Sequence, residues 1–164
     1  IFEGDLSQYG SNQAKLSTTL VKQLALYVTM YSPLQMAADL YQSYEKHLDA
    51  FQFIKDVAVD WDNTYILEAE PGDYITIARK AKGKNEWYIG GITDENAREA
   101  VIELSFLPEG KKYEATIMPT AKRQTGVPIR KTTSSLPRKY SSKTVLKQRL
   151  APSGGVAISI KELE

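Results

Sequence analysis

The sequence has no cysteine and only one histidine, His47, among its 164 residues. Without cysteine, the chain cannot form disulfides, thiol nucleophiles or cysteine-ligated zinc sites. A single histidine excludes a histidine-based metal cluster and leaves His47 as the one candidate for a lone histidine general base. We interpret His47 instead as an exposed or half-packed residue of a helix, which is the commoner position for a single histidine.

Long apolar runs are also missing. No stretch reaches the roughly 18 consecutive apolar residues that a membrane-spanning helix needs, and the first residues, IFEGDLSQYG, lack the charged-then-apolar pattern of a targeting signal. The sequence therefore predicts no membrane span. The apolar content of 42% is nevertheless ample for the core of one domain.

Acidic residues are absent from one part of the chain. Nine of the 21 Lys and Arg residues lie between Met118 and Arg149, where there is no Asp or Glu, which leaves 12 basic residues against 20 acidic ones elsewhere. Clustered positive charge is typical of phosphate-binding surfaces. This run contains only one aromatic residue, Tyr140, and no nucleic-acid-binding motif, so we interpret it as a solvated loop and expect no nucleic-acid partner.

Residues 24–31, LALYVTMY, are apolar at every position except Thr29. A helix that is apolar on all sides is typical of an element packed between two layers, and an isolated small domain offers only one. The pattern indicates that the chain is a piece of a larger protein. Ser11 or Asn12 is the expected N-cap, and Pro33 is expected to end the helix after Tyr31.

Two further helical segments are expected before the pattern changes. Residues 34–40 resemble one or two additional helical turns, and residues 44–57, YEKHLDAFQFIKDV, have the spacing of an amphipathic helix. After Trp61 the period of the pattern falls from 3.6 to 2. Seven strands are expected at residues 64–69, 74–80, 86–93, 100–106, 112–117, 145–150 and 156–161. Tight turns such as Pro71-Gly72-Asp73 separate them, which predicts an antiparallel β-sandwich.

Two groups of residues in this β-rich part suggest ligand binding. An acidic run could bind calcium, but it fails the EF-hand template, and we interpret it as solvated strand ends. Four aromatic residues could form a sugar-stacking platform, or could lie in the core and at the edge of the sandwich. The acidic residues are Asp60, Asp62, Glu68, Glu70 and Asp73, and the aromatic ones are Trp61, Trp87, Tyr88 and Tyr113.

Three long stretches resemble the C-terminal region of glycoside hydrolase family 97, which contains bacterial α-glucosidases and α-galactosidases. They are QLALYVTMYSPLQMAADL at residues 23–40, HLDAFQFIKDVAVDWDNTYILEAEPGDYITIARKAKGKNEWYIGGITDENAR at residues 47–98 and LAPSGGVAISIKE at residues 150–162. The resemblance covers most of the chain without gaps in these stretches. It lapses in residues 118–142 and resumes at Lys143.

The resemblance implies an α+β fragment. Residues 1–57 would be the terminal loop and helices of a (β/α)₈ catalytic barrel, and residues 58–164 a C-terminal antiparallel β-sandwich of the oligomerisation type, with 118–142 atypical. The catalytic carboxylates and calcium ligands of the family lie upstream of the position matching Ile1. We therefore assign no catalytic, cofactor-binding or metal-binding residue to this chain, and expect it to be non-catalytic by itself.

The resemblance also implies the properties of the parent enzyme. The parent would hydrolyse terminal α-glucosidic or α-galactosidic bonds of oligosaccharides, use calcium, and be periplasmic or secreted. The expected partners of this chain are the upstream barrel and N-terminal sandwich, together with a second copy. As an alternative, the chain could be a stand-alone carbohydrate-binding or protein-interaction β-sandwich.

Two structural expectations follow from the resemblance. The helix at residues 24–31 becomes the closing helix of the barrel, which we expect to contact the β-domain through the helix at 44–57 and to leave its other side as an exposed apolar patch. For residues 118–142 our hypothesis is a shifted reading frame, because regrouped codons could encode an acidic, family-like segment. The nucleotide sequence tests this hypothesis: if no single-base shift restores such a segment, the basic run is genuine.

Overall fold

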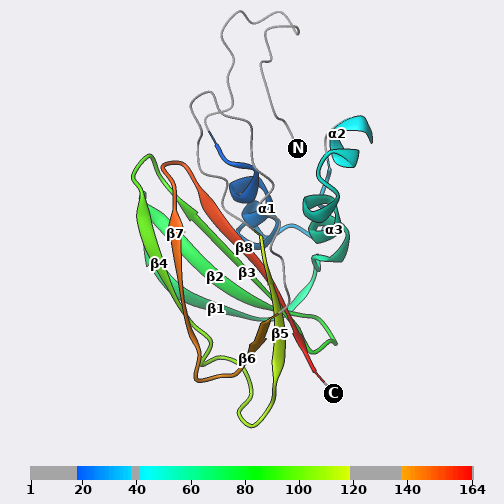
Figure 1. The fold of residues 1–164 in the computed structure, drawn as a ribbon, viewed down its shortest axis with the longest axis vertical. Helices are drawn as coiled ribbons and strands as arrows, with labels where there is room; N and C mark the ends of the chain where they lie inside the picture. Colours follow the sequence, from blue (N-terminus) through cyan, green and yellow to red (C-terminus); the bar gives the residue numbers. More distant parts are fainter. Residues whose placement is uncertain (1–17, 38–40, 119–137, 164) are drawn as a thin grey trace, which may run out of the picture.

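The computed structural model describes residues 18–37, 41–118 and 138–163 (Figure 1). Three helices precede eight strands. The helices are α1 (Leu20–Thr29), α2 (Tyr41–Glu45) and α3 (Leu48–Asp56). The strands are β1 (Trp61–Glu70), β2 (Tyr74–Ala81), β3 (Glu86–Thr93), β4 (Arg98–Glu103), β5 (Tyr113–Ile117), β6 (Arg138–Tyr140), β7 (Val145–Leu150) and β8 (Gly155–Glu162).

The strands form two antiparallel sheets. Six strands make the larger sheet in the order β1-β2-β3-β8-β5-β6, and β4 pairs with β7 in a separate two-stranded sheet. Strands β1, β2 and β3 follow one another through tight turns, in which Gly72 (φ 93°) and Gly83 (φ 67°) adopt the left-handed backbone that glycine tolerates. The last strand, β8, inserts between β3 and β5 and so closes the centre of the sheet.

One hydrophobic core lies between the two sheets. Trp87 and Tyr113 meet edge to face in it, with ring centroids 5.5 Å apart, and are 2% and 0% exposed. Ala100 and Ile102 of β4 and Leu150 of β7 cover them from the smaller sheet. The predicted antiparallel β-rich architecture is therefore confirmed, and the seven expected strands are found with bounds that differ by up to three residues, most at β1 and β4.

A second core lies on the opposite face of the large sheet, where the helices pack (Figure 1). Val21, Leu24 and Val28 of α1 are buried there against Tyr88 of β3 and Ala157 of β8. Successive strand residues point to opposite faces, so Trp87 enters one core and Tyr88 the other. The described residues thus form three layers, with helices on one side, the large sheet in the middle and β4–β7 on the other side.

Helix α1 differs from the prediction in its bounds and its contacts. It begins at Leu20 because Thr19 caps it, accepting a hydrogen bond from the Lys22 backbone N–H (3.2 Å), whereas Ser11 and Asn12 lie outside the described residues. It ends at Thr29, because Met30 is already extended. The helix packs directly on β3 and β8, so the expectation that it contacts the β-domain through the helix at 44–57 is wrong.

Two other expectations about the N-terminal part are corrected. Residues 34–37 form no helical turn, and residues 38–40 lie outside the described part. The expected single helix at 44–57 is divided into α2 and α3 at His47, whose backbone (φ −135°, ψ 60°) is not helical. The rings of Tyr44 and Phe51 meet across this break in a tilted arrangement, with centroids 4.6 Å apart, and so connect α2 to α3.

The atypical segment 118–142 falls largely outside the described residues. Met118 is buried in the helix-side core. The segment ends in β6, a strand that the sequence did not predict and that pairs with β5 through Tyr113 and Tyr140. No helix of the described residues is both long and apolar enough to cross a membrane.

Candidate interaction surface

Large apolar side chains remain exposed between the end of α1 and the start of α3. Each of them is between 60% and 76% exposed. We define the helix-side apolar surface as Met30, Tyr31, Leu34, Met36, Tyr41 and Leu48. Scattered exposed apolar residues are ordinary, but several of them close together in the sequence make this part of the chain a candidate interaction site.

The connection that carries this surface is held in place by hydrogen bonds. Tyr27 Oη donates to the Met36 carbonyl oxygen (3.0 Å), and Ser32 Oγ donates to the Leu34 carbonyl oxygen (2.7 Å). Gln35 Nε2 donates to the Met30 carbonyl oxygen at 3.4 Å. These bonds give residues 30–37 a defined path without helix, so the exposed side chains stand on an organised segment.

Arg79 lies beneath one end of this surface and was not singled out from the sequence. Its side chain is only 8% exposed, and its guanidinium lies 5.7 Å from the centre of the Tyr31 ring and 5.8 Å from that of Trp61. Nη2 donates to the Thr29 carbonyl oxygen at 3.5 Å, at the negative end of α1. Burial lowers the pKa of Arg79. The cation thus joins α1, β2 and the apolar surface.

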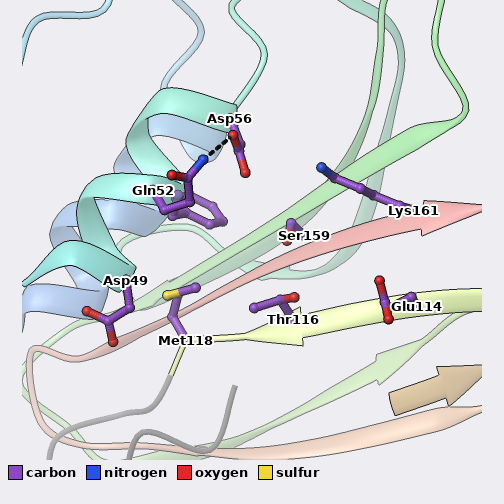
Figure 2. A pocket seen from close by; sticks show the side chains of 9 residues that line it. Asp49, Gln52, Asp56, Glu114, Thr116, Met118, Ser159 and Lys161 are labelled. Carbon is purple, nitrogen blue, oxygen red and sulfur yellow. Dashed lines mark hydrogen bonds between the residues drawn. The ribbon is translucent and has the colours of Figure 1, made fainter. Parts of the chain in front are cut away.

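A polar groove lies beside α3 (Figure 2). It encloses about 220 Å³, with Asp49 and Asp56 of α3 facing Glu114 of β5 and Lys161 of β8. Gln52 Nε2 donates to Asp56 Oδ1 at 2.7 Å, so one of the carboxylates is already engaged. Within the described part of the chain, no group of three or more His, Asp and Glu residues is placed to hold a metal ion.

Three of the five residues in the acidic run that was considered as a calcium site form ion pairs instead. Lys82 holds the pKa of the Asp60 carboxyl below its usual range by hydrogen bonding, assisted by the Trp61 backbone N–H. Glu70 and Asp73 are exposed at the β1–β2 turn. The ion pairs are Asp60 with Lys82 (2.7 Å), Asp62 with Lys80 (3.5 Å) and Glu68 with Arg98 (3.0 Å).

The structure does not bring the four aromatic candidates onto one exposed surface. Trp87 and Tyr113 lie in the core between the sheets, and Tyr88 lies in the helix-side core. Trp61 is half-buried against Tyr88, with ring centroids 5.9 Å apart. The interpretation as a sugar-stacking platform is therefore wrong, because alternation along β3 sends neighbouring rings to opposite faces.

The remaining candidates occupy ordinary positions. His47 is half-buried at the N-cap position of α3. Lys122, Arg123, Arg130 and Lys131 of the basic run lie outside the described residues. Among the described members of that run, Lys147 forms an exposed ion pair with Glu99 (3.6 Å).

These features define a β-rich interaction domain: two stacked antiparallel sheets, helices on one face, and an organised apolar surface beyond them. Residues 60–161 match the family described as "Glycosyl-hydrolase 97 C-terminal, oligomerisation". The chain therefore belongs to glycosyl hydrolase family 97, and this part of it is the C-terminal oligomerisation region of that family.

Two individual proteins illustrate the relationship. The chain is 38% identical over 143 residues to a retaining alpha-galactosidase of Bacteroides thetaiotaomicron, an alignment that covers 87% of this chain and 21% of that protein. A solved glycoside hydrolase family 97 enzyme from Pseudoalteromonas sp. strain K8, in complex with acarbose, is 44% identical with a TM-score of 0.81. It is matched over 90% of this chain and 23% of its own. The chain thus spans about a fifth of the length of these relatives.

Proposed function

We propose that the chain is the C-terminal accessory and oligomerisation part of a glycoside hydrolase that cleaves terminal α-galactosidic or α-glucosidic bonds. The observation that carries this proposal is the helix-side apolar surface on a chain that spans only about a fifth of its relatives. A surface of this kind needs a covering body. In this proposal the body is the upstream part of the same polypeptide.

This assignment divides the chain into two structural parts. Residues 1–57 form the end of a (β/α)₈ barrel, and residues 58–164 form the oligomerisation domain. The start of the family match at residue 60 supports this boundary. Helix α1 packs on β3 and β8, so the barrel would be joined rigidly to the β-domain through one shared core.

The chemistry of the parent enzyme belongs to the upstream part in this proposal. The α-galactosidase name of the Bacteroides relative supports a galactoside as substrate. In this proposal the catalytic carboxylates and any calcium are held by barrel loops upstream of this chain. A periplasmic or secreted location would be set by a leader upstream of this chain.

Hydrolysis of nitrophenyl α-galactoside and nitrophenyl α-glucoside tests the proposal. We expect no turnover by this chain and turnover by the polypeptide extended upstream to include the barrel. Turnover by the chain alone would contradict the proposal. A gene without a barrel-sized region upstream, roughly 250 residues or more, would also contradict it and would support a stand-alone binding module.

A further inference from the structure

Arg79 is the one charged residue that is buried in the described part of the chain, with 8% of its surface exposed. Alternation along β2 places it on the same face as Ile77 and Ala81, which are 5% and 1% exposed. Its cross-strand neighbour on β3 is Tyr88 of the helix-side core. An arginine among such neighbours calls for a partner, because arginine is almost never buried unless it is paired.

The described residues supply no counterion for Arg79. Its Nε–H group is buried and has no hydrogen-bond acceptor among them, and Nη2 makes only the 3.5 Å bond to the Thr29 carbonyl oxygen. Asp60 and Asp62 near the start of β1 are paired with lysines instead. Burial lowers the pKa of Arg79, which is the direction expected for a cation without a nearby carboxylate.

Arg98 shows the contrast. One of its nitrogens, Nη1, is also buried without an acceptor among the described residues, but Nη2 lies 3.0 Å from Glu68 Oε2. Its guanidinium also lies 3.2 Å from the centre of the Tyr74 ring. Arg98 therefore has both an aromatic neighbour and a carboxylate, whereas Arg79 has aromatic neighbours alone.

Two aromatic rings hold the Arg79 guanidinium in place without neutralising it. The rings of Tyr31 and Trp61 attract the cation, but they do not provide the negative charge and the in-plane acceptors with which a guanidinium pairs. Tyr31 is 60% exposed and belongs to the helix-side apolar surface. A body that covers this surface would therefore meet Tyr31 with the guanidinium beside it.

Covering the surface makes the missing counterion more important. A docked body removes water from around Arg79, and a buried charge is tolerated only when it is paired and hydrogen-bonded. The Thr29 carbonyl oxygen, at the end of α1, contributes only a fraction of a negative charge. A carboxylate matches the charge and the planar fork of a guanidinium best.

We propose that Arg79 receives an Asp or Glu side chain from the upstream part of the same polypeptide, beside Tyr31 on the helix-side apolar surface. This inference rests on the proposed function, in which the upstream part covers that surface, and it adds the chemistry of the contact. The upstream part is the occupant argued for, because most of the length of the relatives lies outside this chain.

Hydrogen exchange of the polypeptide extended upstream tests the proposal with two variants. Arg79→Gln keeps a hydrogen-bond donor but removes the charge, and Arg79→Lys keeps the charge. The amides of residues 30–37 should exchange at least about tenfold faster in the Arg79→Gln variant than in the native polypeptide, because the carboxylate of a buried pair is left without its cation. The Arg79→Lys variant should retain part of the protection.

The same change in this chain alone separates docking from folding. Without the upstream part no carboxylate pairs with Arg79, so Arg79→Gln should change the urea midpoint of the chain little. Lys80→Gln in the extended polypeptide is the matched control. Lys80 is the next cation on β2, points to the opposite face and pairs with Asp62, so its loss should leave the exchange of residues 30–37 unchanged.

The outcomes distinguish the two levels of the argument. Equal exchange of residues 30–37 in the native chain and the native extended polypeptide would contradict the proposed docking and this inference with it. Protection that survives Arg79→Gln, or that Arg79→Lys loses as fully, would leave docking in place and contradict the carboxylate. An equal loss of stability in both proteins would make Arg79 a structural residue of the core. Protection that grows with the concentration of the chain alone would assign the surface to a second copy.

Discussion

Gly90 lies where α1 comes closest to the large sheet. A Cβ atom at this position would stand 2.7 Å from the Ala25 carbonyl oxygen and 2.8 Å from Val28 Cβ. Both distances are shorter than real contacts, and the first involves backbone that cannot rotate away. The absence of a side chain at Gly90 therefore sets how closely the helix and the sheet pack.

Gly90→Ala should lower the free energy of unfolding by about 1–3 kcal/mol, because overpacking forces the helix off the sheet. Urea denaturation of both proteins measures the difference. Thr64→Ala, an exposed change on β1, should stay within about 0.5 kcal/mol of the native chain. Equal stability of the Gly90→Ala variant and the native chain would mean that α1 does not pack this closely.

Tyr88 makes stability depend on pH in the alkaline range. The residue is 1% exposed, and its hydroxyl lies 2.7 Å from the Asp56 carbonyl oxygen and 3.2 Å from Glu86 Oε2. Burial, together with the charge of Glu86, raises the pKa of Tyr88. The folded state therefore keeps the proton at a pH where the unfolded chain, with a tyrosine pKa near 10, has begun to lose it.

The sign of the effect follows from this difference. The contribution of Tyr88 is fully present below about pH 10 and is lost as the pH rises toward the folded pKa, since the unfolded state then binds fewer protons. Tyr88→Phe should cost about 0.5–1.5 kcal/mol at neutral pH and flatten the alkaline fall. Unfolding free energies of both proteins between pH 8 and 11 measure it, and parallel curves would refute this role.

At the scale of elements, one ion pair connects a strand of the smaller sheet to a strand of the larger one. Arg98 of β4 donates from Nη2 to Glu68 Oε2 of β1 at 3.0 Å, and its guanidinium stacks 3.2 Å from the centre of the Tyr74 ring. Both charged side chains are less than one-fifth exposed. Thr76 Oγ1 donates to Glu68 as well (2.9 Å), which fixes the carboxylate on the large sheet.

Arg98→Met should lower the free energy of unfolding by about 1–3 kcal/mol, because it leaves a partly buried carboxylate without its cation. Thermal or urea unfolding measures the change. Lys82→Met, which breaks the exposed pair with Asp60, should alter the unfolding midpoint little, because solvent screens that pair. If the two substitutions had equal effects, Arg98 would not join the sheets.

The elements themselves were largely predictable from the sequence. Strand positions follow from local signals, namely the alternation along each strand and turn residues such as Gly72 and Gly83. The break at His47 and the start of α1 at Leu20 were not predicted, because packing between Tyr44 and Phe51 and capping by Thr19 override the apolar period. The insertion of β8 between β3 and β5 pairs distant segments and has no local signal.

The candidate surfaces were predictable only in part. An exposed apolar patch near residues 24–40 was expected, but the structure places it after α1 rather than along it. Arg79 gave only a weak signal, as one of two adjacent cations in the otherwise mostly apolar strand YITIARKA.

At the scale of the whole molecule, the layered fold places the helices and the two-stranded sheet on opposite faces of the large sheet (Figure 1). In the proposed arrangement the helix-side apolar surface receives the upstream body, and the shared core between α1 and the large sheet holds that surface in place.

Hydrogen exchange tests this account most directly. The amides of residues 30–37 and 41–48 should exchange quickly in this chain and at least about tenfold more slowly in the polypeptide extended upstream, since docking by 1.4 kcal/mol or more would bury the helix-side apolar surface. Residues 74–81 of β2, already inside the sheet, serve as the internal reference. Equal exchange of residues 30–48 in the two proteins would contradict the assignment of this chain as the docked C-terminal part of a larger glycoside hydrolase.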